Sequence, residues 1–450
     1  MKKLPTDILI NFITLFVLVI ITEALTRQAV FNFVAIVYLV QFVVIVYVGY
    51  TFYDRNKFFL SPSFIFLLYT DISFIIGAFL FSIGLDFTNE QMVHYFNINN
   101  IKRISVIFLL ANSVILLSYK PIDDYKIYLN IVKPKIKGLV LFLGLCGFLL
   151  FSNIRINLNF LGGDGDFSLY PQILSLILIF YYLAVKKIKT RVFFYLALIA
   201  IFASTHYDSK RLAISLFFPI LFLEIHFKNI SIFKNFWRTG VVSSIVFVIL
   251  LIFITSMSIR RGYGGFGVKN YFESFKYIPE YIGSDYFSKV LIANTEVTMT
   301  YFHSVDAINY VCNDVGQLKY GSTFMKVFFL PLPRSIVPSK PKSSVAWYTT
   351  ISDPIYYRRG GSYPINIVSE FFLNFYYLFF IPLYFFFLFL NKSYLRLIAL
   401  IVNKKLSKLL ILLYAYTFLF AAIRGSGLDL FVLAILLVLP FYFFLKKLGI

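Results

Sequence analysis

Hydrophobic residues dominate this chain in long, uninterrupted blocks that are separated by short polar or basic connections. Blocks such as Phe12–Ile21 and Leu378–Leu390 are continuous, whereas the strands of outer-membrane barrels alternate apolar and polar residues over about ten positions. The pattern therefore predicts helices, about twelve of which are long enough to cross a membrane. These spans are expected at residues 8–25, 29–51, 62–84, 103–118, 138–153, 169–185, 192–205, 212–227, 239–259, 364–390, 409–423 and 428–445.

Between the ninth and tenth spans the pattern changes to a basic, tyrosine-rich stretch from Arg260 to Tyr363. Apolar residues recur every three or four positions from Asp285 to Tyr310, which predicts one amphipathic helix across the outer mouth of the bundle. Phe324–Leu330 is apolar but too short to span, and the prolines after it exclude a continuous helix, so this part is expected to dip into the membrane interface and return. The expected divisions are a membrane domain (1–259), a large loop (260–363) and a second membrane domain (364–450).

The composition agrees with this class, because hydrophobic residues make up 60% of the chain against about half in a soluble globule. The expected fold is an all-α, polytopic integral membrane protein. Met1-Lys2-Lys3 and the apolar run after it imitate a signal peptide, but Glu23–Arg27 offers no small-residue cleavage site, so the first helix is expected to be retained. Cys146 and Cys312 lie in unlike surroundings, and the sequence has no Cys/His cluster, which argues against a disulfide bond and a zinc site.

The net charge of +21 is mainly a signal of topology. Lys and Arg are unevenly distributed, with about 23 in one set of short connections and about 7 in the other, and basic connections stay in the cytoplasm. Both termini are therefore expected on the cytoplasmic side and the large loop on the outer side. This distribution argues against nucleic acid as a partner, and it leaves the outward cations to be explained by an anionic ligand.

Two tight outward turns place an arginine just before a predicted span. Lys210 and Arg211 end the sequence Asp-Ser-Lys-Arg, and Arg424 begins the sequence Arg-Gly-Ser-Gly. A helix start disfavours cations unless an anion binds its free N–H groups, so the two turns are predicted to frame one phosphate site. Snorkelling of these cations to lipid headgroups is the alternative interpretation.

The large loop adds cations on stiff or hinged segments. The stretch Pro331–Pro341 is stiffened by prolines and displays Arg334 and Lys340, and rigidly placed cations suit diphosphate binding; a plain linker is the alternative. The glycine-rich run at 262–267 lacks the strand and the Lys-Ser/Thr of a P-loop, which favours a hinge over a nucleotide site. The arginines that flank such glycine hinges are Arg260, Arg261, Arg358 and Arg359.

Glu370 is the candidate acid within the membrane. It follows Pro364 by six residues, which is about 9 Å along a helix that starts there, and it shares one helix face with Asn374. An ionisable group at that depth is costly unless it faces a wet cavity or a cation, so its presence indicates a function. A Glu–Arg pair that simply holds helices together is the alternative.

A second candidate base lies in the predicted loop helix. Glu296, Thr300 and His303 share one face of that helix, where a base would be reachable by substrate from solution. A solvated helix face without a catalytic role is the alternative interpretation.

These residues resemble the bacterial oligosaccharide repeat-unit polymerases, also called O-antigen polymerases (Wzy). The number of spans and the position of the large loop agree with that family over most of the chain. The resemblance implies an architecture similar to that of the GT-C glycosyltransferases. The segments that carry it are Ser209-Lys210-Arg211, Gly321-Ser-Thr with Pro333-Arg334 and Pro338-Ser-Lys340-Pro341, Glu370 with Asn374-Phe375, and Arg424-Gly425.

Membership of that family would imply an enzyme of the bacterial inner membrane whose site faces the periplasm. The growing glycan would pass from undecaprenyl diphosphate to the sugar of an incoming lipid-linked repeat unit. Glu370 would act as the base, with His303 as the second choice, and Asn374 would position the acceptor. Neither a metal nor a cofactor is expected, and the expected partners besides the substrate are membrane lipid and a chain-length regulator. The arginines that would hold the diphosphate are Arg211, Arg334 and Arg424.

Other outcomes and functions remain compatible with the sequence. A single displacement would invert the configuration of the anomeric carbon. A two-step reaction with Glu370 as carboxylate nucleophile would retain that configuration. A ligase that moves finished glycan onto lipid A core would differ only in its acceptor. A flippase or other transporter for the lipid-linked unit would concentrate polar residues near the bilayer midplane, whereas here they crowd one face.

Overall fold

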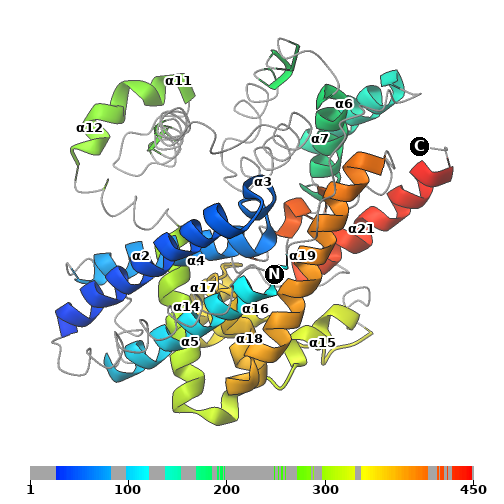
Figure 1. Cartoon of the computed structure of the whole chain (residues 1–450). Coiled ribbons are helices and arrows are strands. Elements are labelled where there is room, and N and C mark those ends of the chain that lie inside the picture. Colours follow the sequence, from blue (N-terminus) through cyan, green and yellow to red (C-terminus); the bar gives the residue numbers. More distant parts are fainter. Residues whose placement is uncertain are drawn as a thin grey trace. The chain divides into compact units, whose positions relative to one another are not determined.

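The computed structural model describes residues 27–82, 98–120, 137–153, 169–184, 271–284, 296–329, 336–403 and 428–447, together with short pieces between 190 and 287 and between 413 and 423. Within these ranges every regular element is a helix (Figure 1). The all-α class and the membrane character are therefore confirmed, while the count of twelve spans and the side on which the loop lies stay predictions. Among the described residues, the helices long and apolar enough to cross a membrane are α2 (Arg27–Phe52), α4 (Pro62–Ser82), α5 (Ile98–Ser118) and α19 (Phe380–Asn403).

Several further helices begin and end near the predicted limits. α6 (Lys137–Asn153), α7 (Leu169–Ala184) and α21 (Leu428–Lys447) occupy three predicted spans, and α14 (Glu296–Asn313) covers the second half of the predicted loop helix. The predicted spans at 8–25, 192–205, 212–227, 239–259 and 409–423 lie largely or wholly outside the described residues. The shorter elements are α3 (Arg55–Phe58), α11 (Tyr271–Ser274), η4 (Phe275–Tyr277), α12 (Ile278–Ile282), η5 (Val315–Gln317), α15 (Ser322–Phe329), α16 (Ser344–Ser352), α17 (Pro354–Arg358), α18 (Ile367–Phe375) and η6 (Tyr376–Leu378).

The chain forms two compact units. In the unit of Leu129–Ile156 and Phe167–Glu296, α6 packs closely against α7. A Cβ atom added to Gly144 would lie 2.8 Å from Cγ1 of Ile179, so a glycine is needed for this approach. The other unit carries the candidate site and is called the main unit; it consists of Met1–Tyr128, Asn157–Asp166 and Val297–Ile450.

Phe74 of α4 lies at the aromatic centre of the main unit. Its ring centroid lies 4.7 Å from that of Tyr38 in α2, 4.4 Å from that of Phe108 in α5 and 4.7 Å from that of Tyr301 in α14. One turn further along α4, a Cβ atom on Gly77 would lie 2.7 Å from Cγ of Tyr301. Because no side chain fits there, α14 packs directly on the apolar helices, crossing α4 as Figure 1 shows.

The predicted single span at 364–390 is wrong, because the structure breaks it into two helices. α18 ends at Phe375, because the next residue, Tyr376, has a φ of 49°. A right-handed helix cannot contain this conformation, and residues other than glycine rarely adopt it. The chain then makes the short turn η6 before α19 starts at Phe380. α18 also begins at Ile367, so Glu370 lies about 4.5 Å from the helix start rather than about 9 Å from it.

A buried polar contact ties α19 to α4 and α5. The side-chain amide of Asn391 donates hydrogen bonds to the hydroxyl oxygens of Ser63 at 2.7 Å and Ser118 at 3.1 Å. All three side chains are buried. In an apolar bundle such a contact sets the rotation of one helix relative to two others.

Replacing Asn391 by leucine is expected to lower the thermal midpoint of the purified protein in detergent, because the three-helix contact is lost at a cost of about 1–2 kcal/mol. The matched control is Lys392→Gln, which alters the exposed neighbouring residue. Equal midpoints for the two variants would show that the contact contributes nothing to stability.

Candidate functional site

Glu370 lies in the first turn of α18. Asn366 caps this helix, because its side-chain oxygen accepts a hydrogen bond from the backbone N–H of Val368 at 2.7 Å. The dipole of a helix favours a negative charge at this end. With 4% of its surface exposed, Glu370 is a buried carboxyl group at this end of the helix.

A hydroxyl group and an amide group complete the surroundings of Glu370. Oγ1 of Thr323 donates to Oε1 of Glu370 at 3.3 Å, and Nδ2 of Asn374 donates both to Oγ1 of Thr323 and to the backbone carbonyl of Glu370 at 2.7 Å. The predicted shared face of Glu370 and Asn374 is confirmed. Oδ1 of Asn374 is buried and has no hydrogen-bond partner among the described residues, so its capacity to accept a hydrogen bond is unused.

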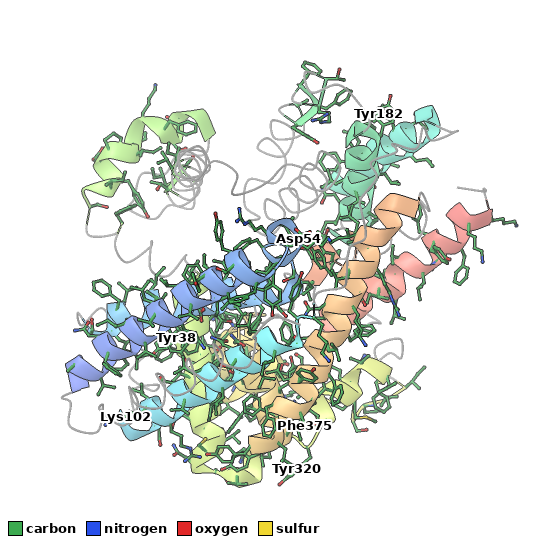
Figure 2. The ribbon with its side chains drawn as sticks, viewed as in Figure 1. Tyr38, Asp54, Lys102, Tyr182, Tyr320 and Phe375 are labelled. Carbon is green, nitrogen blue, oxygen red and sulfur yellow. The ribbon has the colours of Figure 1, made fainter. Side chains whose placement is uncertain are left out.

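Thr323 reaches this position because a tight turn docks α15 on α18. Tyr320 and Gly321 both have positive φ, at 46° and 83°, and the backbone N–H of Lys319 donates to the carbonyl of Leu373 at 2.9 Å. Phe324 then stacks on Phe375, with ring centroids 5.7 Å apart. Tyr320 and Phe375 accordingly lie at the same end of the main unit (Figure 2).

His303 is buried, and the prediction that it is reachable from solution is wrong. Only 1% of its surface is exposed, because this face of α14 packs inside the main unit. Thr300, predicted on the same face, is also buried and lies 3.0 Å from the hydroxyl oxygen of Tyr69 in α4. The backbone of Glu296 begins α14, and its side chain lies outside the described residues.

A chain of hydrogen bonds runs from His303 to a buried carboxyl group. Nδ1 of His303 lies 3.1 Å from the hydroxyl oxygen of Tyr348 in α16, and that hydroxyl group donates to Oδ2 of Asp306 at 2.7 Å. Burial lowers the pKa of His303 to about 3 and raises the pKa of Asp306 to about 6, the latter against the hydrogen bond from Tyr348. The imidazole is therefore neutral at physiological pH.

Tyr363 covers the imidazole ring, and Tyr356 in turn stacks on Tyr363. Tyr363 stacks on His303 at a centroid distance of 4.1 Å and an interplanar angle of 21°, and Tyr356 stacks on the other side of Tyr363 at 4.8 Å. The hydroxyl group of Tyr363 donates to Oδ2 of Asp353 at 3.0 Å. The tyrosine-rich character of the predicted loop thus has a structural role around His303.

The helices that carry the two candidate bases are joined by Ser304. Its hydroxyl oxygen accepts a hydrogen bond from the backbone N–H of Asn366 at 2.8 Å, and its carbonyl accepts one from Oγ of Ser369 at 3.1 Å. Asn366 also donates to Oγ1 of Thr70 in α4 at 3.1 Å. The start of α18 is therefore fixed on α14 and α4 by polar contacts.

The predicted cations are only partly described. Lys340 is buried, with 4% of its surface exposed, whereas Arg358 and Arg359 are exposed beside the turn at Gly360. Within the described ranges, no group of three or more His, Cys, Asp or Glu residues is placed to hold a metal ion. The cations that lie outside the described residues are Lys210, Arg211, Arg260, Arg261, Arg334 and Arg424, so their convergence on one diphosphate site stays a prediction.

Sequence reasoning missed a polar cluster inside the apolar helices. Nδ2 of Asn112 in α5 donates to Oδ1 of Asp71 in α4 at 2.7 Å and to Oε1 of Gln41 in α2 at 2.9 Å. Asp71 has no exposed surface. The signal was present, because an acidic residue in the middle of the predicted span 62–84 is as unusual as Glu370.

Compared with protein-family models, with curated proteins and with solved structures, the chain has no significant match. The assignment of a function therefore rests on the geometry of the described residues and on the motif segments that they contain.

The pH dependence of stability should separate His303 from Asp306, because their contributions have opposite signs. In the unfolded chain His303 binds a proton below about pH 6.5, whereas in the folded protein it does so only near pH 3. His303 therefore makes the folded protein less stable as the pH falls from about 6.5 towards 3. In the folded protein Asp306 keeps its proton up to about pH 6, whereas in the unfolded chain it does so only up to about pH 3.8. Asp306 therefore makes the folded protein less stable as the pH rises from about 3.8 towards 6.

Between pH 6 and 4 the two contributions offset each other in the wild-type protein. On acidification, the thermal midpoint of Asp306→Asn is therefore expected to fall more steeply than that of the wild type. The thermal midpoint of His303→Gln is expected to fall less steeply. The measurement is the thermal midpoint of purified protein as a function of pH. Parallel curves for all three proteins would contradict the assignment.

Proposed function

We propose that this chain polymerises oligosaccharide repeat units linked to undecaprenyl diphosphate, on the periplasmic face of the bacterial inner membrane. The growing glycan is transferred from its lipid diphosphate to the sugar of an incoming repeat unit. The product is O-antigen or a related surface polysaccharide.

One observation carries this proposal. Two of the segments that resemble the polymerase family, Gly321-Ser-Thr323 and Glu370 to Phe375, are far apart in sequence, yet Thr323 hydrogen-bonds to both Glu370 and Asn374. A carboxylate, a hydroxyl group and an amide with an available acceptor atom are groups that recognise sugar hydroxyls. The resemblance thus involves residues that form one buried polar site in an apolar helical protein.

The proposed reaction requires one acid–base step and the release of one anion. The acceptor hydroxyl attacks the anomeric carbon, its proton passes to a buried base, and the bond from that carbon to the diphosphate oxygen breaks as the new glycosidic bond forms. Glu370 and His303 are the candidate bases. The lipid diphosphate leaves as an anion, and its charge is stabilised by fixed cations, for which Arg211, Arg334 and Arg424 are proposed.

Glu370→Gln and Thr323→Val are expected to abolish or sharply reduce polymer in cells whose own copy has been deleted, because the first removes the carboxylate and the second its hydrogen-bond donor. Thr323→Ser keeps the hydroxyl group and should restore polymer. Lipopolysaccharide on a gel is the measurement, and Glu280→Gln, at an exposed position, is the control.

The pattern of the remaining lipopolysaccharide distinguishes the rival functions. Loss of a polymerase leaves single repeat units on lipopolysaccharide, whereas loss of a ligase or of a flippase leaves none. Normal polymer from Glu370→Gln at wild-type protein levels would refute the site, and lipopolysaccharide without any repeat unit would refute the polymerase.

Substitution of the proposed diphosphate-binding cations is expected to abolish polymer as well. Arg211→Ala, Arg334→Ala and Arg424→Ala each remove a charge that binds the leaving group, and the expected loss of transfer rate is about 100-fold or more. Arg396→Ala, at an exposed position of α19, is the control, and the membrane level of each variant is measured by immunoblot. Wild-type polymer from all three variants would exclude arginine-based stabilisation of the leaving group.

A further inference from the structure

His303, Tyr348 and Asp306 form a buried relay with an available polar atom at each end. The relay is defined by the contacts from Nδ1 of His303 to the hydroxyl group of Tyr348 and from that hydroxyl group to Oδ2 of Asp306. All three side chains are buried, with 3% or less of their surface exposed. Nε2 of His303 and Oδ1 of Asp306 have no hydrogen-bond partner within the part of the chain that the structure describes.

The positions of the protons are determined by counting donors. The hydroxyl group of Tyr348 has one proton, and it is donated to the Asp306 carboxylate. The contact between Tyr348 and Nδ1 of His303 is then a hydrogen bond only if Nδ1 carries the proton of the neutral imidazole. Nε2 is therefore a bare acceptor, and burying such an atom without a partner costs about 1–3 kcal/mol.

We propose that Nε2 of His303 binds a hydroxyl group of the ligand and accepts its proton, with Tyr348 and Asp306 as the positioning residues that carry a proton onward. As the ligand proton moves to Nε2, the proton on Nδ1 passes to the oxygen of Tyr348 and the tyrosine proton passes to Oδ2 of Asp306. The ligand oxygen gains the electron pair of its O–H bond, and Asp306 ends as a neutral acid. If the proposed function holds, the ligand is the acceptor sugar.

Burial favours this route over a charged imidazole. An imidazolium is disfavoured in this environment, as the lowered pKa of His303 indicates, whereas a neutral Asp306 is favoured, as its raised pKa of about 6 indicates. A relay that delivers the proton to Asp306 never leaves a net charge on His303. Glu370, which accepts a hydrogen bond from Thr323 in the first turn of α18, is then left to interact with positive charge at the anomeric carbon.

The groups that face the relay come from three places. α14 contributes Asp306 itself, α16 contributes Tyr348, and the segment between α17 and α18 contributes Tyr363, which is hydrogen-bonded to Asp353. Tyr363 covers the imidazole on a non-helical segment that begins beside Gly360, whose φ is 80°.

The tautomer of His303 tests the relay without any assay of polymer formation. The chain has only four histidines, so protein labelled with ¹⁵N-histidine gives few signals, and the signal lost in His303→Gln identifies this residue. Above the pKa of Asp306 the relay requires the proton on Nδ1, and below it the proton moves to Nε2. ¹⁵N chemical shifts of the purified, full-length protein distinguish the two forms.

Tyr348→Phe and Asp306→Asn are each expected to abolish the pH-dependent exchange between tautomers. Tyr357→Phe, which removes a tyrosine hydroxyl group outside the relay, should leave the exchange unchanged. A proton on Nε2 in the wild-type protein at neutral pH, or a tautomer that does not respond to either relay variant, would overturn the proposal.

The catalytic role is tested with purified enzyme and lipid-linked repeat units. Tyr348→Phe is expected to lower kcat about 100-fold with KM little changed, because the variant still binds substrate but cannot pass the proton on. A relay variant with normal kcat would refute the proton transfer. If the wild-type chain forms no polymer while the tautomer responds as expected, the proposed function fails and the hydroxyl-binding site stands.

Discussion

The burial of α14 among apolar helices is the constraint on which the candidate site depends. A helix that carries Thr300, His303, Ser304, Asp306 and Asn309 into such surroundings is stabilised when these side chains find partners on neighbouring helices, because an unpaired polar group in an apolar medium costs several kcal/mol. The partners come from α4, α5, α16 and α18. The polar groups of the site are for this reason connected in chains, and each chain fixes the position of one helix relative to another.

Properties that depend on a single helix could be predicted from the sequence. The length of the apolar segments predicts an all-α membrane protein, and the four-residue spacing of Glu370 and Asn374 places them on one helix face. The burial of His303 and its contact with Tyr348 depend on which helices pack together, and no local pattern encodes that choice. The break after Phe375 could not be predicted for another reason. Tyr376 adopts a positive φ, and the sequence there has no glycine or proline, the residues that usually indicate a turn.

Under the proposed function, proton transfer and the binding of the diphosphate belong to different residues. Among the described residues, no cation contributes to the pKa of His303 or Asp306, whereas the exposed arginines beside Gly360 lie in the segment that leads to Tyr363. A cation close to a base lowers its affinity for a proton, so an enzyme that must both accept a proton and bind a diphosphate benefits from keeping the two groups apart.

The cluster of Gln41, Asp71 and Asn112 has a consequence for biogenesis. An aspartic acid side chain, Asp71, at the centre of α4 makes this helix costly to place alone in hydrocarbon, by about 2.5–3.5 kcal/mol on the scale of translocon insertion. The amide of Asn112 offsets part of this cost, but α5 is synthesised after α4 and so arrives later. A single hydrogen bond therefore makes α4 easier to integrate together with α5 than before it, which links the order of membrane insertion to the packing of the finished bundle.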